Sequence, residues 1–119
     1  MKVLTVLVPT YNVEKYLRRC LDSLLLPEVL EEIEVLVVND GSKDGSADIA
    51  RAYEKKYPQT VVFVDKENGG HGSTINVGIE KAQGTYFKVL DSDDWVNIGD
   101  FIEFVKRLKE ETADAVICD

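Results

Sequence analysis

Five short apolar runs constrain the fold of this 119-residue chain more than any other feature. They are rich in Val, Ile and Leu and cover residues 3–8, 33–38, 61–64, 86–90 and 115–118. The runs are largely continuous rather than alternating, which is the pattern of strands in a parallel sheet that is covered on both faces. The chain length suits one domain and is too short for two ordinary ones. The sequence therefore predicts one sheet of five buried strands.

The segments between these runs have the periodicity of helices. Apolar residues recur every three or four positions in four stripes, which span residues 16–25, 49–57, 75–82 and 101–108. The expected caps and stops are Asn12 at the start of the first helix, Ser42, Asp44 or Ser46 at the start of the second, Pro27 at the end of the first and Gly84 at the end of the third. Alternating strands and helices predict an α/β fold, with a doubly wound, mostly parallel sheet and helices on both faces.

The charge balance limits the partners that the chain can bind. It has 22 acidic and 14 basic residues and a net charge of −8, which opposes binding to nucleic acid or to an anionic membrane surface. A nucleotide diphosphate can still bind among carboxylates when a divalent cation lies between them. No apolar stretch approaches the ~20 residues of a membrane-spanning helix. We therefore expect a cytoplasmic protein, whose membrane association, at the inner face of the cytoplasmic membrane, would require parts outside this sequence.

Ligands in doubly wound folds bind at the carboxyl ends of the strands, so the loops that follow strands are the candidate site. Residues 9–12 offer a hydroxyl, an aromatic ring and an amide to a ligand. Pro and Asn are also ordinary at a helix start, and these residues taken alone favour a helix start over a binding site. Residues 39–46 are dense in Asn, Asp, Gly and Ser, which is turn chemistry. A turn explains Asp40 less well, because a carboxylate at a strand end can accept hydrogen bonds from a base or a ribose.

The loop at residues 67–74 is rich in glycine and opens the third helix. Backbone amides at such a helix N-terminus can approach an anionic group closely. The loop lacks the Lys and Thr spacing of a phosphate-binding P-loop. His71 alone is weak evidence for a metal ligand or a base, and we interpret it as a loop residue or an incidental ligand contact.

Three carboxylates follow the fourth apolar run in the segment Asp91-Ser92-Asp93-Asp94-Trp95. Like charges this close repel one another, so the fold gains nothing from them unless a cation, caps or hydrogen bonds compensate. If the strand geometry continues beyond the run, Asp91 and Asp93 point to the same side. Paired carboxylate oxygens of this kind are the ligands that Mg²⁺ and Mn²⁺ prefer.

The order and spacing of four motifs resemble those of family-two inverting glycosyltransferases, which have the GT-A, Rossmann-like nucleotide-binding fold. The motifs are Pro9-Thr10-Tyr11-Asn12, Asn39-Asp40-Gly41-Ser42, Asn68-Gly69-Gly70 with Asn76 and Gly78, and Asp91-Ser92-Asp93-Asp94-Trp95. The resemblance implies that the chain binds a nucleotide diphosphate sugar, expected to be a UDP-sugar, with Mn²⁺ or Mg²⁺. It also implies a part of an enzyme that transfers the sugar to an acceptor hydroxyl in the synthesis of glycans or cell-surface polysaccharides.

The resemblance assigns roles to particular residues. The implied nucleotide-binding residues are Pro9, Thr10, Tyr11, Asp40, Asn68, Gly70, Asn76 and Asp91, and the implied metal ligands are Asp93 and Asp91, with Asp94 as a neighbour. In the family, the general base and the pocket for a glycan or lipid-linked acceptor lie further along the chain. Residues 1–119 are therefore expected to be the nucleotide-sugar-binding part of a glycosyltransferase domain, truncated at its C-terminus and inactive alone.

Two positions depart from the family pattern. Thr74-Ile75 precede Asn76 where the family usually has Ala-Arg, so a basic residue expected near the phosphates is missing there. Lys88 lies inside an apolar run, where it could supply a compensating charge or extend its ammonium group to water at the sheet edge.

Two other classes of acidic, metal-binding α/β domain are alternatives. A response-regulator receiver domain has a similar length but needs an acidic pair after the first strand, where this chain has Pro9-Thr10. A haloacid-type phosphatase has a motif like Asp91-Ser92-Asp93, but that motif normally follows the first strand. A purely structural module would leave the carboxylate cluster unexplained.

Overall fold

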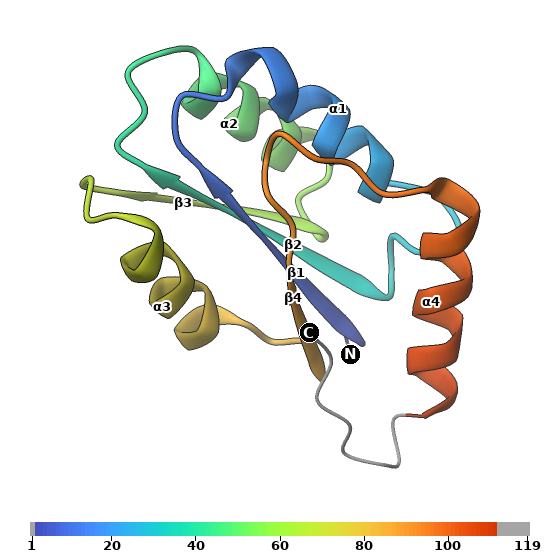
Figure 1. The fold of residues 1–119 in the computed structure, drawn as a ribbon. Coiled ribbons are helices and arrows are strands. Elements are labelled where there is room, and N and C mark those ends of the chain that lie inside the picture. The colour runs from blue at the N-terminus through green and yellow to red at the C-terminus, as the bar shows by residue number, and fades with distance from the viewer. Residues whose placement is uncertain (1, 112–119) are drawn as a thin grey trace.

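A computed structural model of the chain describes residues 2–111, in which four strands alternate with four helices (Figure 1). The elements are β1 (Leu4–Thr10), α1 (Glu14–Leu24), β2 (Ile33–Asp40), α2 (Ser46–Lys56), β3 (Val61–Lys66), α3 (His71–Lys81), β4 (Tyr86–Val89) and α4 (Ile98–Glu110). The first four predicted strands and all four predicted helices are confirmed. The fifth predicted strand, at residues 115–118, lies outside the described residues. Within residues 2–111, none of the helices combines the length and the apolar character needed to cross a membrane.

The four described strands pair in parallel in the order β3-β2-β1-β4. Strand β1 is central, and its register runs from Leu4 opposite Ile33 to Thr10 opposite Asn39. The chain builds outward from β1 through β2 to β3, and then returns to add β4 on the other side of β1. This change of direction is the switch point at which doubly wound folds bind ligands. A receiver domain has the order 2-1-3-4-5, which differs from the order observed here.

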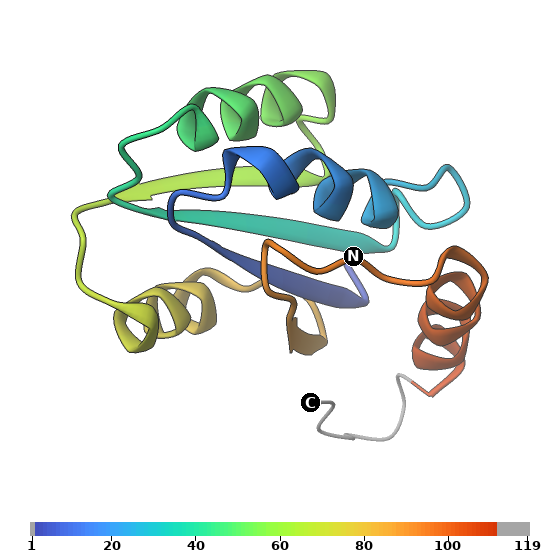
Figure 2. The ribbon, with the colours of Figure 1, turned by 45° about the horizontal axis from the view of Figure 1, so that its top comes forward.

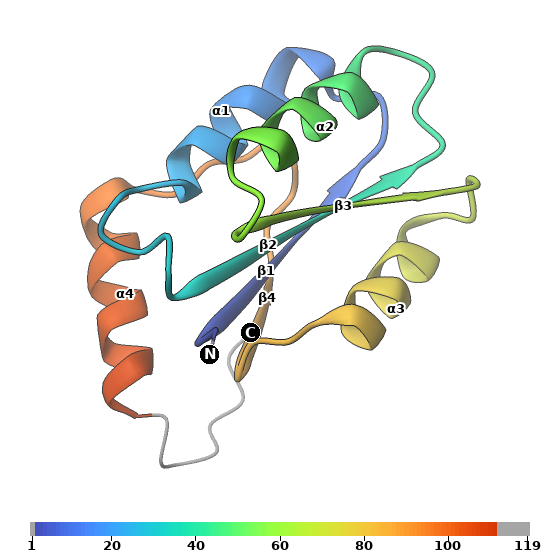
Figure 3. The ribbon, with the colours of Figure 1, turned by 180° about the vertical axis from the view of Figure 1, so that it is seen from behind.

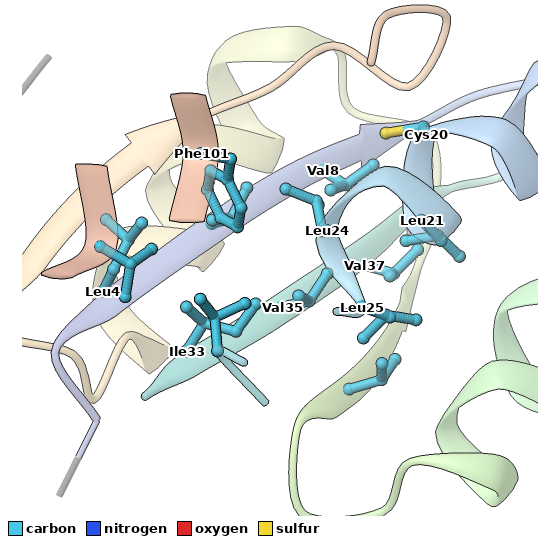
Figure 4. Close-up of a cluster of buried hydrophobic side chains, with 14 of the residues drawn as sticks. Leu4, Val8, Cys20, Leu21, Leu24, Leu25, Ile33, Val35, Val37 and Phe101 are labelled. Atoms are coloured by element: carbon cyan, nitrogen blue, oxygen red, sulfur yellow. The ribbon is translucent and has the colours of Figure 1, made fainter. Parts of the chain in front are cut away.

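Helices cover both faces of the sheet, as predicted (Figure 2; Figure 3). Helices α1, α2 and α4 pack on one face, where residues such as Val8, Val35 and Val37 meet Leu21 and Leu24 of α1 (Figure 4). Helix α3 packs on the other face, over a second cluster built on Leu7, Leu36 and Val38. Every residue of β2 is buried. The continuous apolar runs of β1 and β2 are therefore explained by burial on both faces, whereas β3 and β4, at the edges of the described sheet, are mostly half-buried.

The predicted cap of the first helix, Asn12, is wrong. The N-cap position of α1 is Val13, without a side-chain cap. Asn12 has a left-handed φ of 51°, and its Oδ1 accepts a hydrogen bond from the Lys43 amide at 2.8 Å. The first amides of α1 are instead satisfied by the loop before α2, because Ser46 Oγ accepts from the Val13 amide at 3.0 Å and Asp44 Oδ2 accepts from the Glu14 amide at 3.1 Å.

The N-termini of α1 and α2 cap each other. Asp44 Oδ1 also accepts from the Ser46 amide at 3.0 Å, so this one carboxylate serves both helices. In return, the Glu14 carboxylate accepts from the Gly45 amide. Three residues were predicted as caps of the second helix, and of these Asp44 accepts a hydrogen bond from the first amide of α2. The N-cap position itself is Gly45. The reciprocal bonds hold the loops after β1 and β2 in a fixed relative position.

The predicted stop residues lie a few positions beyond the helix ends. Helix α1 ends at Leu24 rather than at Pro27, and α3 ends at Lys81 rather than at Gly84. The structure gives Gly84 another role, because a Cβ atom there would lie 2.5 Å from the Thr5 backbone nitrogen and 2.7 Å from the Leu4 carbonyl carbon. The Gly84 amide also donates to Thr5 Oγ1 at 2.8 Å. Glycine at this position thus permits the close approach of the chain to β1.

We predict that Gly84→Ala lowers the free energy of unfolding by about 2 kcal/mol, because overpacking a tight contact costs roughly 1–3 kcal/mol. Gly72→Ala is the matched control, since a Cβ atom on Gly72 would meet nothing within 4 Å. The control should stay within about 0.5 kcal/mol of the parent. Urea unfolding measures both values, and equal stabilities of the two variants would contradict the role assigned to Gly84.

We also predict that Asp44 makes stability depend on acidic pH. Burial acts to raise its pKa, but the Ser46 hydroxyl and the amides of Ser46 and Glu14 outweigh it and hold the pKa of Asp44 below its ordinary 3.8. A group with a lowered folded-state pKa stabilises fully above the unfolded value, and this stabilisation is lost as the pH falls through the folded value. Asp44→Ala should therefore cost about 1 kcal/mol or more at pH 7, the usual effect of a lost cap, and less below pH 3.

The control for Asp44 is Asp48→Ala, which removes a carboxylate from the same helix region. The Asp48 side chain is 89% exposed and pairs only with Arg51, at 3.6 Å, among the ion pairs of the described residues. Exposed pairs of this kind contribute little. Urea unfolding at pH 7 and at pH 3 compares the variants, and the same loss at both pH values for Asp44→Ala would overturn the assignment.

Candidate functional site

A cavity of about 600 Å³ opens at the carboxyl ends of the strands. Its lining comes from the carboxyl ends of β1 and β2, from the loops that follow β1, β3 and β4, and from the start of α3. It consists of Pro9, Thr10, Tyr11, Val13, Asp40, Asn68, Gly70, His71, Thr74, Asp91, Ser92 and Asp93. All the residues that the sequence predicts as nucleotide or metal ligands are in this set except Asn76. Asn76 is exposed on α3 and does not line the cavity, so its role stays a prediction.

The loop after β1 supplies one wall of the cavity. Thr10 is buried and its hydroxyl donates to the Val8 carbonyl at 3.1 Å, so its oxygen retains acceptor capacity toward a ligand. The Tyr11 side chain, by contrast, is 49% exposed. An exposed aromatic ring at the rim of a polar cavity is able to stack on a planar base.

Asp40 is the last residue of β2 and is buried, with internal partners at both carboxylate oxygens. Its Oδ1 accepts from Lys66 Nζ at 2.6 Å and from the Gly69 amide at 2.9 Å, and its Oδ2 accepts from the Gly70 amide at 3.1 Å. Burial acts to raise the pKa of Asp40, but the Lys66 ammonium and the two glycine amides outweigh it and lower the pKa. Asp40 is therefore a charged carboxylate at neutral pH.

Lys66 was not predicted from the sequence. It is the last residue of β3, directly before the glycine-rich loop, and its pairing with Asp40 across the sheet follows from the parallel register of β2 and β3. The signal that could have identified it is a lysine at the carboxyl end of an apolar strand, where site residues gather.

The glycine-rich loop does not present its amides to the cavity in the way that was expected. The Gly69 and Gly70 amides already donate to Asp40, so the anion that they bind is a carboxylate of the same chain. Gly70 has a left-handed φ of 90°, which lets the chain turn into α3. Thr74 is buried under the loop, and its hydroxyl donates to the Gly70 carbonyl at 3.1 Å. His71 lines the cavity and is exposed.

The carboxylates after β4 meet, but not for the predicted reason. Strand β4 ends at Val89, and the following residues form a turn in which the Asp94 amide donates to the Asp91 carbonyl at 2.9 Å. This turn, rather than continued strand alternation, brings carboxylate oxygens of Asp91, Asp93 and Asp94 within 4.8 Å of one another. Three exposed carboxylates form an all-oxygen donor set, which fits Mg²⁺ or Mn²⁺.

Contacts with α1 anchor the segment that carries the carboxylates. The Arg19 guanidinium lies 3.8 Å from the centre of the Trp95 ring, and Ser23 Oγ accepts from the Val96 amide at 3.1 Å. Cys20 lies beneath the turn, where burial and the neighbouring acidic charges raise the pKa of its thiol to about 12. The thiol therefore stays protonated at neutral pH and is a poor metal ligand.

Lys88 does not line the cavity at the strand ends. It pairs in register with Val6, and its side chain borders a smaller hollow of about 280 Å³ together with Phe101 and Phe104 of α4. Lys88 therefore does not bring the compensating positive charge, which the sequence suggested, to the residues that line the cavity.

Two solved structures resemble this chain closely. TarS 1–349 of S. aureus in complex with UDP has a TM-score of 0.78 and 34% sequence identity, covering 93% of this chain and 33% of that one. The mannosyltransferase PcManGT of Pyrobaculum calidifontis, in complex with GDP-Man and Mn²⁺, has a TM-score of 0.76 and 27% identity, covering 87% of this chain and 31% of that one. The described sheet and helices are therefore those of a GT-A fold.

Sequence comparison agrees with the structural one. The glycosyltransferase GlyA of Streptococcus pneumoniae serotype 4 is 38% identical over 115 residues, which make up 96% of this chain and 16% of GlyA. The chain thus spans about a third of the two solved structures and less of GlyA. The model of the family described as Glycosyl transferase family 2 matches residues 5–119. The receiver and phosphatase alternatives are set aside, and the chain belongs to glycosyltransferase family 2.

Proposed function

We propose that the chain binds a UDP-sugar and a divalent cation in the cavity of about 600 Å³, as the donor-binding part of an inverting glycosyltransferase. The observation that carries the proposal is the meeting of two chemically different groups in one cavity. At one end, Asp40 and the loop after β1 offer acceptors and an aromatic ring. At the other, Asp91 and Asp93 line the cavity, and together with the neighbouring Asp94 they offer the ligands of a hard cation.

The nucleoside end favours a base that carries an N–H donor. Asp40 is charged, and its Oδ2 accepts only one hydrogen bond among those found in the described residues, which leaves room for another. The N3–H of uracil can supply it, whereas the N3 of cytosine is an acceptor and would be repelled. Guanine also carries a suitable N–H, and PcManGT binds GDP-Man, but TarS, with the higher sequence identity, was solved with UDP and with UDP-GlcNAc.

The acidic end needs a cation before it can hold a diphosphate. The chain carries a net charge of −8, and Asp91 and Asp93 line the cavity. When bound there, Mn²⁺ or Mg²⁺ would act as a Lewis acid that stabilises the negative charge on the departing nucleoside diphosphate. Asp91, Asp93 and Asp94 would hold the ion, and the anchoring of their turn on α1 would keep the ligand oxygens in place.

The acceptor side of the reaction is not accounted for by the carboxylates that line the cavity within residues 2–111. The carboxylates that line the cavity within residues 2–111 are Asp40, Asp91 and Asp93, which serve the nucleoside and the metal in this proposal. An inverting transfer also needs a base within hydrogen-bond reach of the attacking hydroxyl. We propose that this base and the site for a glycan or lipid-linked acceptor come from the two thirds of the relatives' length that this chain does not span.

We predict that UDP binds at least about tenfold more tightly with Mn²⁺ or Mg²⁺ than with EDTA, a difference of about 1.4 kcal/mol. The cause is repulsion between the diphosphate and the carboxylate cluster when no cation lies between them. Uridine is the control ligand, because it has no diphosphate and should bind equally in both conditions. Isothermal titration calorimetry measures all four affinities, and equal affinities for UDP with and without the cation would refute the metal-bridged site.

We predict that Asp93→Asn removes most of the metal-dependent part of UDP binding and leaves uridine binding unchanged. The variant should unfold within about 0.5 kcal/mol of the parent, because it relieves repulsion in an exposed cluster. Asp48→Asn removes the same charge from the exposed surface of α2 and should bind UDP as the parent does. Parent-like binding of UDP and Mn²⁺ by Asp93→Asn would show that the metal assignment is wrong.

A further inference from the structure

Lys66 forms an ion pair with Asp40 that is mostly shielded from water. The two side chains are only 15% and 9% exposed, and the ammonium also donates to the Glu67 carbonyl at 2.7 Å. A buried ion pair is weak evidence for stability in itself, because desolvation offsets much of its attraction. Because Asp40 of this pair lines the cavity, the pair calls for a functional explanation.

The bonds to Asp40 leave one carboxylate position for a ligand. Two donors, Lys66 Nζ and the Gly69 amide, occupy Oδ1, whereas the Gly70 amide alone binds Oδ2. Each carboxylate oxygen accepts about two hydrogen bonds. Because Asp40 lines the cavity, the remaining capacity at Oδ2 is available to a ligand there. Lys66 binds the other oxygen and so fixes the rotation of the carboxylate.

The same lysine holds the glycine-rich loop against the end of β2. A Cβ atom on Gly69 would lie 3.1 Å from Lys66 Nζ, a tight contact, so glycine leaves the ammonium more room beneath the loop than a larger residue would. Asn68 Nδ2 donates to the Asp40 carbonyl at 3.1 Å. A Cβ atom on Gly41 would lie 3.0 Å from the backbone nitrogen and from Cβ of Asn68. The loops after β2 and β3 are therefore packed together around the Lys66–Asp40 pair.

We infer that Lys66 is a positioning residue for nucleoside binding: its ammonium orients the Asp40 carboxylate and holds the glycine-rich loop, so that Oδ2 is presented to the base. The inference rests on the proposed nucleotide site.

The inference predicts a coupling between Lys66 and Asp40 in ligand binding. Lys66→Met should weaken uridine binding about tenfold, within the range of coupling between residues in one hydrogen-bonded network. In an Asp40→Asn background, Lys66→Met should have almost no further effect, because Lys66 acts through Asp40. Lys66→Arg keeps the charge and should recover most of the affinity. Lys81→Met, which removes an exposed charge at the end of α3, is the control and should bind as the parent does.

The pH profile separates positioning from a purely structural role. The titratable groups near Asp40 are Lys66 on β3 and, among the other residues that line the cavity, Tyr11, His71, Asp91 and Asp93. Because Lys66 lowers the pKa of Asp40, its removal should move the acid limit of uridine binding to higher pH. All variants are compared in a His71→Gln background, which removes the only histidine of the chain. A structural role alone would lower stability and leave this pH limit where it is.

The experiment combines calorimetry with uridine, between pH 3 and pH 7, and NMR of the ligand-free chain. In the NMR arm, Lys66→Met should raise the titration midpoint of the Asp40 carboxyl carbon and speed hydrogen exchange at the Gly69 and Gly70 amides. If Lys66→Met unfolds, Lys66→Gln takes its place in both arms. Failure of the parent to bind uridine or UDP would refute the proposed function, while the NMR arm would still test the hold of Lys66 on Asp40. Parent-like uridine binding by the lysine variant, or additive losses in the double variant, would overturn the inference.

Discussion

The parallel pairing of β1 with a strand on each side is the constraint on which the rest of the structure depends. Because β2 and β4 both run parallel to β1, their carboxyl ends emerge at one edge of the sheet. Parallel neighbours require crossover connections, which place helices on both faces and bury the sheet. The loops that follow the strands therefore lie at the same edge of the sheet. The cavity is a direct consequence of this topology.

Electrostatics then divides that cavity into two unlike ends. The Asp40 charge is held by internal donors, Lys66 and two glycine amides, and lies in a buried setting. The charges of Asp91, Asp93 and Asp94 are exposed and close to one another. A carboxylate whose charge is balanced by hydrogen bonds suits recognition of a neutral base, whereas a cluster of carboxylates that repel one another suits a cation. An acidic chain is in this way compatible with an anionic ligand.

The sequence predicted the strands well, because burial on both faces requires continuous apolar runs that are easy to recognise. It also located most of the cavity residues, since the motifs follow strands whose ends must converge. It failed where tertiary contacts replaced local rules. The side-chain oxygen of Asn12 accepts a hydrogen bond from the loop between β2 and α2 instead of capping its own helix. Asp91 and Asp93 meet through a turn rather than through continued strand geometry. Lys66 was missed because its meaning depends on a partner 26 positions away in the chain.

A crystal structure of the chain with UDP and Mn²⁺ would show directly whether a cation bridges the diphosphate and the carboxylates, because anomalous scattering locates manganese independently of the protein coordinates. We expect one manganese peak between the diphosphate and the carboxylates of Asp91, Asp93 and Asp94, with the uracil N–H directed at Asp40 Oδ2. UDP bound in the cavity without a manganese peak, in crystals grown with saturating Mn²⁺, would contradict the metal-bridged site. UDP bound with its base away from Asp40 would contradict the role of Asp40.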